Sequence, residues 1–231
     1  MIRGLIFDFD GLVADTESAE YQSWQELFAE YDRALPLAVW SEAVGAAVDA
    51  FDALAYLESL LGRAIPERLA VRDRRRHRYL DLVLASPVLP GVRELLAEAK
   101  EAGLRLGLAS SSSREWVVGH LTRLGLVDYF DCFRTSDDVA SVKPDPGLYL
   151  AALEALSLRT REAIALEDSP SGIQAAKAAG LYCVAIPNPL TAQLELGLAD
   201  RRLTSMADVR LEDLVAEAER ALAQGGAVDG A

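Results

Sequence analysis

Short apolar runs separated by helical patterns constrain the fold of this chain more than any other feature. The runs are 4–7 (GLIF), 104–109 (LRLGLA), 129–133 (YFDCF), 163–166 (AIAL) and 182–186 (YCVAI). Such runs are typical of strands that are buried on both faces of a sheet. Between them, segments 91–103 and 171–180 carry apolar residues at helical spacing and end in glycine. This alternation predicts an α/β fold, a doubly wound parallel-sheet (Rossmann-like) core with helices on both faces.

The stretch 16–85 interrupts the alternation, because it shows helical patterns and no clear strand. Apolar or aromatic residues at 21, 24, 27, 28 and 31 form one helical stripe. The segment 85–91 (ASPVLPG) has two prolines and a glycine, which is typical of a return linker. We therefore expect an α/β core of residues 1–15 plus 86–223, an inserted all-helical cap of residues 16–85, and a disordered Gly/Ala-rich tail of residues 224–231.

Polar side chains stand where several of the apolar runs end. In an open α/β sheet, ligands bind outside the carboxyl ends of the strands. We therefore expect these side chains to meet at one edge of the sheet. They are Asp8 and Asp10 after the first run, Ser110 to Ser113 after the second, Glu167 and Asp168 after the fourth, and Lys143 in the segment SVKPDP.

This combination of residue types has a consistent chemical meaning. Clustered carboxylates without His or Cys favour a hard divalent cation, Mg²⁺ above all. A lysine and a serine are suited to phosphate oxygens. Asp8 and Asp10 stand two positions apart, so on an extended chain they face the same side. One carboxylate can then attack phosphorus while the other protonates the leaving oxygen.

Charge and hydropathy narrow the range of partners. The net charge of −13 disfavours binding to nucleic acid and to anionic membranes. No apolar run reaches the roughly 18–20 residues of a membrane span, and no secretory signal pattern is present. Cys132 and Cys183 stand in apolar runs, which favours reduced, buried thiols. We expect a cytoplasmic monomer whose partner is a small phosphorylated metabolite.

The order of these motifs resembles that of the haloacid dehalogenase-like hydrolase superfamily over nearly the whole chain. The motifs are DFDGLVADT, LASSS, VKPDP and LEDSPSGI. The inserted cap is similar to the branch that holds beta-phosphoglucomutase-like proteins and many sugar-phosphate phosphatases.

The resemblance implies a role for each motif residue. Asp8 would be the nucleophile that forms an aspartyl-phosphate, and Asp10 the general acid and then the base that activates water. An acid at Asp10 argues against dehalogenation, because a departing halide needs no proton. Phosphate would be held by Ser110, Ser111 and Lys143, and Mg²⁺ by Asp8, the Asp10 carbonyl and Asp168, with Glu167 close by.

The chain departs from beta-phosphoglucomutases at groups that would hold a second phosphate. Glu20 stands where that family has a histidine, and 44–51 (VGAAVDAF) lacks its cap arginine. Ser113, followed by Arg114, stands where a lysine is expected. A mutase needs two phosphate sites and a phosphatase needs one, so we expect a Mg²⁺-dependent phosphatase. A phosphomutase is the alternative, and a phospho-accepting module without turnover is a third reading.

Four further side chains are candidates for substrate contact. Glu17 and Glu20 follow the first motif and would bind sugar hydroxyls, although acidic residues are also favoured in the first turn of a helix. Arg76 belongs to the basic run 71–79, which would meet an anionic substrate. The alternative is that this run forms a solvated helix face. Arg114 follows the serine run. The cap is expected to close by bending near 13–17 and 86–90.

Overall fold

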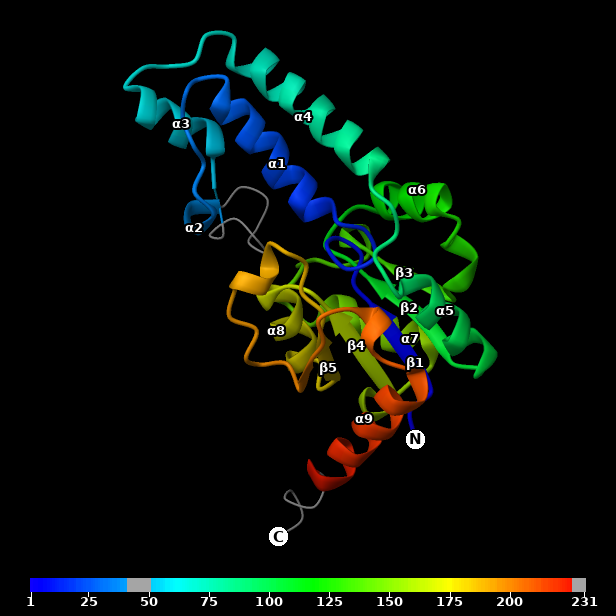
Figure 1. Cartoon of the computed structure of the whole chain (residues 1–231). Helices are drawn as coiled ribbons and strands as arrows, with labels where there is room; N and C mark the ends of the chain where they lie inside the picture. The colour runs from blue at the N-terminus through cyan, green and yellow to red at the C-terminus, as the bar shows by residue number, and fades with distance from the viewer. Residues whose placement is uncertain (41–50, 226–231) are drawn as a thin grey trace.

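The computed structural model describes residues 1–40 and 51–225, and its centre is a six-stranded parallel sheet (Figure 1). The strand order is β3-β2-β1-β4-β5-β6. From β1 the chain first moves outward through β2 to β3 and then returns to β4 on the other side. The carboxyl end of β1 is therefore the point where the strand order reverses, which is where such sheets bind ligands. The strands are β1 (Gly4–Phe7), β2 (Arg105–Ala109), β3 (Cys132–Arg134), β4 (Ala163–Glu167), β5 (Tyr182–Ala185) and β6 (Arg201–Arg202).

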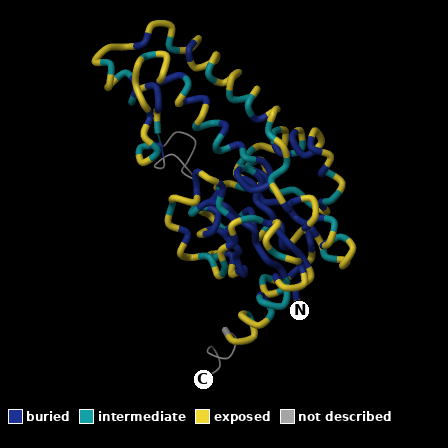
Figure 2. Tube along the Cα trace, viewed as in Figure 1, coloured by how far each residue is buried: buried dark blue, intermediate teal, exposed yellow. Residues whose placement is uncertain are grey.

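Helices cover both faces of the sheet. Along β1, Leu5 and Phe7 join the apolar cluster on one face, whereas Ile6 joins the cluster on the other. All four residues of β1 are buried, as are those of its neighbours β4 and β5, and the middle of the sheet is dark blue in Figure 2. The first cluster includes α5 (Val92–Glu101), α6 (Arg114–Leu124) and α9 (Leu211–Gly225), and the second includes α7 (Gly147–Leu156) and α8 (Pro170–Ala178).

The described part of segment 16–85 forms helices around a third apolar cluster, which also includes Leu190 of the α/β core. Trp24, Leu27 and Phe28 of the first helix pack with Leu54 and Leu57 of the third. The first and fourth helices lie side by side (Figure 1). The helices are α1 (Thr16–Ala29), α2 (Leu37–Trp40), α3 (Ala53–Leu61) and α4 (Arg68–Ala85). The predicted fold class, a doubly wound α/β core with an inserted helical cap, is confirmed.

The two connections between core and cap touch each other. Ala14, on the outgoing connection, forms isolated β-bridges with Asp10 and with Val88 on the returning one. The Leu89 N–H also donates to the Val13 carbonyl at 3.0 Å. The Arg123 guanidinium of α6 donates to carbonyl oxygens at the end of α4, those of Val83, Leu84 and Ser86, at 3.1–3.3 Å.

Three details differ from the expectation or extend it. β3 begins at Cys132 because 127–129 form a 3₁₀ turn, which displaces the strand predicted at 129–133. β6 is two arginines long at the sheet edge and was not predicted, because it contains no apolar run. α9 includes Gln224 and Gly225, and the rest of the predicted tail lies outside the described residues. No helix in the described ranges has the length and apolar character to cross a membrane.

Candidate active site

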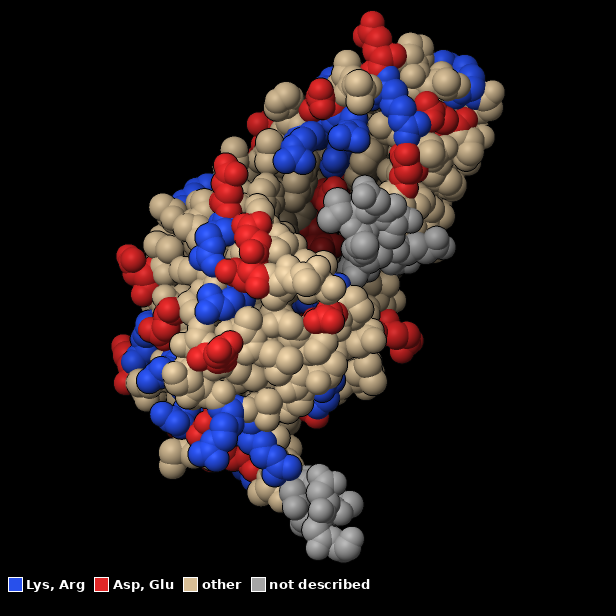
Figure 3. Space-filling view, turned by 180° about the vertical axis from the view of Figure 1, so that it is seen from behind, with Lys and Arg blue, Asp and Glu red and all other residues tan. Residues whose placement is uncertain are grey.

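A cleft of about 1070 Å³ separates the cap from the carboxyl ends of the strands. Figure 3 shows this hollow with acidic side chains inside it and basic side chains on the cap above it. Of the predicted site residues, Glu167 and Arg114 do not line the cleft. The others do: Asp8, Asp10, Ser110, Ser111, Lys143 and Asp168 from the core, and Glu17, Glu20 and Arg76 from the cap.

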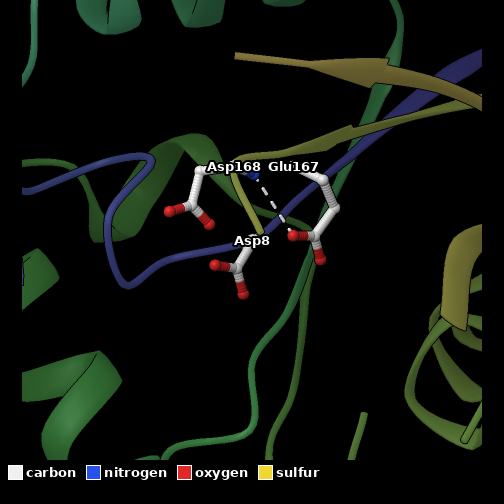
Figure 4. A group of neighbouring side chains, drawn as sticks. All are labelled: Asp8, Glu167 and Asp168. Carbon is white, nitrogen blue, oxygen red and sulfur yellow. Dashed lines mark hydrogen bonds between the residues drawn. The ribbon is translucent and has the colours of Figure 1, made fainter. Parts of the chain in front are cut away.

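Three carboxylates meet at the adjacent ends of β1 and β4 (Figure 4). One oxygen each of Asp8, Glu167 and Asp168 lies within 4.8 Å of the others. All three residues are buried, Glu167 completely. Burial, with smaller contributions from neighbouring carboxylates, raises the pKa of Asp8 to about 7 and raises that of Asp168 well above its usual range. Ionising such a group is costly unless cations lie nearby.

Lys143 is the one cation in contact with this group among the described residues. Its Nζ lies 2.5 Å from Asp8 Oδ1 and 2.6 Å from Glu167 Oε1. Burial lowers the pKa of Lys143, but the two carboxylates outweigh burial and raise that pKa above its ordinary value. One positive charge thus faces three ionisable carboxyl groups. If all three ionise, a further cation is needed to neutralise their charge.

Glu167 is fully occupied by hydrogen bonds from the protein. Its Oε1 accepts from Lys143 and from the Tyr149 hydroxyl, the latter at 2.5 Å. Its Oε2 accepts from the Asp168 N–H at 3.3 Å and from Ser169 Oγ at 3.4 Å. Glu167 therefore adds negative charge to the site and fixes Lys143, with its own oxygens already bonded.

Among the described residues, hydrogen-bond donors reach Asp168 through one oxygen only. Asn188 Nδ2 donates to Asp168 Oδ2 at 2.8 Å and to the Gly11 carbonyl at 3.3 Å. Gly11 has φ +80°, and a Cβ there would lie 2.3 Å from Asp168 Oδ2, so a side chain is excluded. Within the described ranges, no donor reaches Asp168 Oδ1 or Asp8 Oδ2. These two free oxygens, in an all-oxygen site, fit a hard cation such as Mg²⁺.

Asp10 has different surroundings. Its Oδ1 accepts from Thr16 Oγ1 and Trp116 Nε1, both at 2.9 Å. Its Oδ2 accepts from Ser112 Oγ at 2.6 Å and Ser110 Oγ at 3.3 Å. Asp8 and Asp10 thus line one cleft but are held by separate sets of partners, a lysine for Asp8 and neutral donors for Asp10, which suits two different roles.

Backbone N–H groups add to the same pocket. In the described part of the chain, those of Phe9, Asp10 and Ser111 donate to no protein acceptor. Ser110 Oγ accepts from the Ser112 N–H at 3.0 Å, which fixes the serine loop. Free amides beside a lysine form a cradle for an anion.

The predicted cap acids both face the cleft but differ in environment. Burial, then the charges of Asp10 and Glu20, raises the pKa of Glu17 to about 8. Glu20 is half-exposed, and its Oε1 lies 3.3 Å from Arg75 Nη1. Arg75 also contacts Ser23 Oγ at 3.2 Å and lies over the Trp24 ring at 4.3 Å. Arg75, which was not predicted as a site residue, therefore holds the Glu20 carboxylate in place through this ion pair.

Of the two arginines predicted to contact substrate, one lines the cleft and the other does not. Arg76 lines the cleft, as does Arg72 one turn earlier on α4, and neither pairs with another described residue. Arg114 lies outside the cleft, because its guanidinium binds Asp138 at 3.0 Å and its N–H donates to Asp137. Among the described residues, Arg72 and Arg76 are thus two cations of the cap wall without an ion-pair partner, while Arg114 pairs within the α/β core.

Glu17→Gln is expected to stabilise the metal-free protein at alkaline pH. The folded-state pKa of about 8 exceeds the ordinary value of 4.5, so stability is lost as pH rises through this range and Glu17 ionises. We expect a gain on the order of 1–3 kcal/mol near pH 9 and little change near pH 4, measured by denaturant melts in EDTA. Glu26→Gln on the same helix is the control. Arg78 lowers the pKa of Glu26, so this variant should not gain stability. Equal effects of Glu17→Gln at both pH values would contradict the prediction.

Gly172→Ala is expected to destabilise the protein although it adds a good helix former to α8. A Cβ at Gly172 would lie 1.9 Å from Glu167 Oε2, so the buried carboxylate would have to move away from Lys143. We expect a loss of about 2–4 kcal/mol in thermal or denaturant melts. Gly119→Ala in α6 is the matched control, because a Cβ there meets nothing within 4 Å. It should stabilise by about 0.5–1 kcal/mol. Equal shifts for both variants would refute the argument.

Comparison with known proteins places these features in context. The model of the family described as haloacid dehalogenase-like hydrolase matches residues 5–186. The chain is 44% identical over 211 residues to "Putative phosphatase YhcW" of Bacillus subtilis (91% of this chain and 95% of that protein). It is 34% identical to "Hexitol phosphatase B" of Escherichia coli K12 (93% and 97%). The solved structure of a putative beta-phosphoglucomutase from Thermotoga maritima is 25% identical, with a TM-score of 0.75 (94% and 99%).

Proposed function

This chain belongs to the haloacid dehalogenase-like hydrolase family, and from that premise we propose that it is a Mg²⁺-dependent phosphatase. Its substrate would be a small phosphorylated metabolite, a sugar phosphate or a similar phosphomonoester. The observation that carries the proposal is Asp8, buried beside Lys143 and open to the cleft through its second oxygen. The relatives named as phosphatases support it.

In the proposed reaction Asp8 is the nucleophile. Its carboxylate oxygen forms a bond to phosphorus as the ester P–O bond breaks, giving an aspartyl-phosphate and an alcohol. Asp10 gives its proton to the leaving oxygen and then accepts one from the attacking water, whose oxygen releases phosphate and restores Asp8. Lys143, Ser110 and the free amides of the cradle hold the phosphoryl oxygens.

We propose that Mg²⁺ binds between Asp8 and Asp168, with the Asp10 carbonyl as a further ligand. The free oxygens of the two carboxylates support this arrangement. A divalent cation there would neutralise charge on the phosphoryl oxygens and let Asp8 approach them as an anion. Glu167 and Asn188 would orient the site without binding the metal themselves.

The cap would set the specificity. We propose that residues 16–85 form a unit that closes over the core residues 1–15 and 86–223, bending where Ala14 and Val88 meet. Glu17 and Glu20 would accept hydrogen bonds from substrate hydroxyls, and Arg76 with Arg72 would meet an anionic part of the substrate. The enzyme is proposed to act as a cytoplasmic monomer.

A phosphomutase is the second candidate. Arg72 and Arg76 line the cleft one turn apart without partners among the described residues, which supplies cations for a second phosphate. A mutase would pass the phosphoryl group of Asp8 back to another hydroxyl and would hydrolyse its substrate slowly. Activation by a sugar bisphosphate would distinguish it from a phosphatase.

The test is phosphate release from a panel measured with Mg²⁺ and with EDTA. The panel holds glucose 6-phosphate, sorbitol 6-phosphate, ribose 5-phosphate, adenosine 5′-monophosphate and phosphoglycolate. We expect release that needs Mg²⁺ and is fastest for a few related compounds. Absence of release from every compound would overturn the proposal, and conversion of glucose 1-phosphate with glucose 1,6-bisphosphate would then support the mutase.

A further inference from the structure

Four aromatic rings connect the cap to the segment that carries Asp8 and Asp10. Tyr79 of α4 stacks on Trp116 of α6, with ring centroids 5.8 Å apart and an angle of 14° between their planes. Trp116 meets His120 edge-on at 4.2 Å, and His120 stacks on Phe9 at 6.2 Å. Phe9 is completely buried between the two aspartates in sequence. We call Tyr79, Trp116, His120 and Phe9 the aromatic column.

The column contacts Asp10 directly through Trp116. Its indole Nε1–H donates to Asp10 Oδ1 at 2.9 Å. The other described donors to this carboxylate, Thr16, Ser110 and Ser112, are hydroxyls, which can turn and either donate or accept. An indole N–H only donates, so the bond depends on where the whole ring lies. The orientation of Trp116 therefore decides one of the contacts that fix Asp10.

That orientation is set from two sides. On the core side His120 packs against Trp116, and its Nδ1 is buried without a partner in the described ranges, so it serves as a packing group. On the cap side Tyr79 covers the ring almost face to face. The Tyr79 ring belongs to the cap and Trp116 to the core, so a displacement of the cap removes one support of the indole.

We propose that Trp116 is a positioning residue that orients Asp10 for proton transfer to the leaving group, and that Tyr79 makes this orientation depend on the cap. The inference rests on the proposed phosphatase function. Proton transfer demands a donor within hydrogen-bond reach of the leaving oxygen, so a small displacement of Asp10 slows the first step only for substrates whose leaving group needs the proton. The later activation of water by Asp10 is the same for every substrate and does not enter kcat/KM.

The test compares two leaving groups in the full-length Trp116→Phe variant, which keeps a ring but loses the N–H. One substrate is the sugar phosphate of the panel above that wild type cleaves fastest, whose alkoxide must be protonated. The other is p-nitrophenyl phosphate, whose leaving group departs without a proton. We expect kcat/KM for the sugar phosphate to fall about 10-fold more than kcat/KM for the aryl ester. The ratio of kcat/KM for the sugar phosphate to kcat/KM for the aryl ester is measured on one enzyme sample, so it does not depend on the fraction of folded enzyme.

Substitutions at Tyr79 test the link to the cap. Tyr79→Leu removes the stack and should lower the same ratio, whereas Tyr79→Phe keeps the ring and should restore the ratio toward wild type. The Tyr79 hydroxyl makes no hydrogen bond to a described residue, so the two variants differ in the ring, which stacks on Trp116 and also lies 5.7 Å from the Arg75 guanidinium.

If Trp116→Phe leaves the ratio unchanged, whether or not both kcat/KM values fall, the inference is overturned while the proposed phosphatase function stands. An unchanged ratio in Tyr79→Leu would overturn the part assigned to the cap. Wild-type enzyme without activity on any substrate would instead overturn the proposed function, and the inference with it.

Discussion

Asp8→Asn is expected to abolish phosphate release, by at least about 10³-fold in kcat, while the protein stays folded. The amide cannot form the acyl-phosphate bond, and Asp8 is the carboxylate with one oxygen on Lys143 and the other open to the cleft. The fold should persist because burial penalises the charged form of Asp8, and Lys143 keeps Glu167 as a partner. Activity is measured on the best substrate of the panel, and stability by thermal melting in EDTA.

The matched control for this variant is Asp15→Asn, a few residues further along the same segment. Asp15 caps α1 by accepting the Ser18 N–H at 2.9 Å, and asparagine caps helices about as well. We expect near wild-type activity from this control. Mass spectrometry after acid quenching should find a phosphoryl group on the peptide that contains Asp8 in wild type and none in Asp8→Asn. Substantial turnover by Asp8→Asn would contradict the assignment of the nucleophile.

Lys143→Met is expected to impair both activity and stability. It leaves the carboxylates of Asp8 and Glu167 buried without their cation, a loss of about 3–5 kcal/mol. Lys143 lowers the pKa of Asp8, so its removal shifts that pKa further above about 7. Because a raised carboxyl pKa removes stability as pH rises, the deficit should be larger near pH 8.5 than near pH 5.5. Denaturant melts at both pH values, with and without Mg²⁺, give the measurement, and Mg²⁺ should recover part of the loss.

Lys177→Met is the control for Lys143→Met. Lys177 Nζ lies 2.5 Å from Asp200, the same separation as that between Lys143 and Asp8, but both partners are about one-third exposed. An exposed pair contributes about 0–1 kcal/mol, so this variant should lose little stability at any pH and keep its activity. Similar losses in the two lysine variants would show that burial does not set the energetics of the Lys143 contacts.

The sequence is sufficient to predict the central strands of the parallel sheet and the edge at which the site lies, for a physical reason. Strands buried on both faces must be apolar throughout, so the runs at 4–7 and 163–166 stand out from the helices between them. Parallel strands place their carboxyl ends at one edge, which brought Asp8, Lys143 and Asp168 into one prediction. β6 lacks this signal, because an edge strand of two arginines is not buried on both sides.

Other site residues carry no local signal. Asn188 follows β5 and reaches Asp168 across 20 positions, and Tyr149 reaches Glu167 from the first turn of α7. Trp116 contacts Asp10 across 106 positions, and its indole in the sequence looks like any other packing residue. Such contacts depend on how α6 and α7 pack on the sheet, which no single segment determines. Ser112 had a signal in the run of serines, but the sequence does not say which hydroxyl turns toward Asp10.

The contact between the two core–cap connections has a consequence for how this protein could be rebuilt. Because Ala14 and Val88 pair directly, a foreign helical segment needs only two neighbouring ends to be spliced between them. The sheet and its buried carboxylates lie on one side of that pair, and the helices of the cap lie on the other. Under the roles proposed for the cap and for Asp8, exchange of the segment at this junction is therefore a route to new specificities that leaves the chemistry of Asp8 in place.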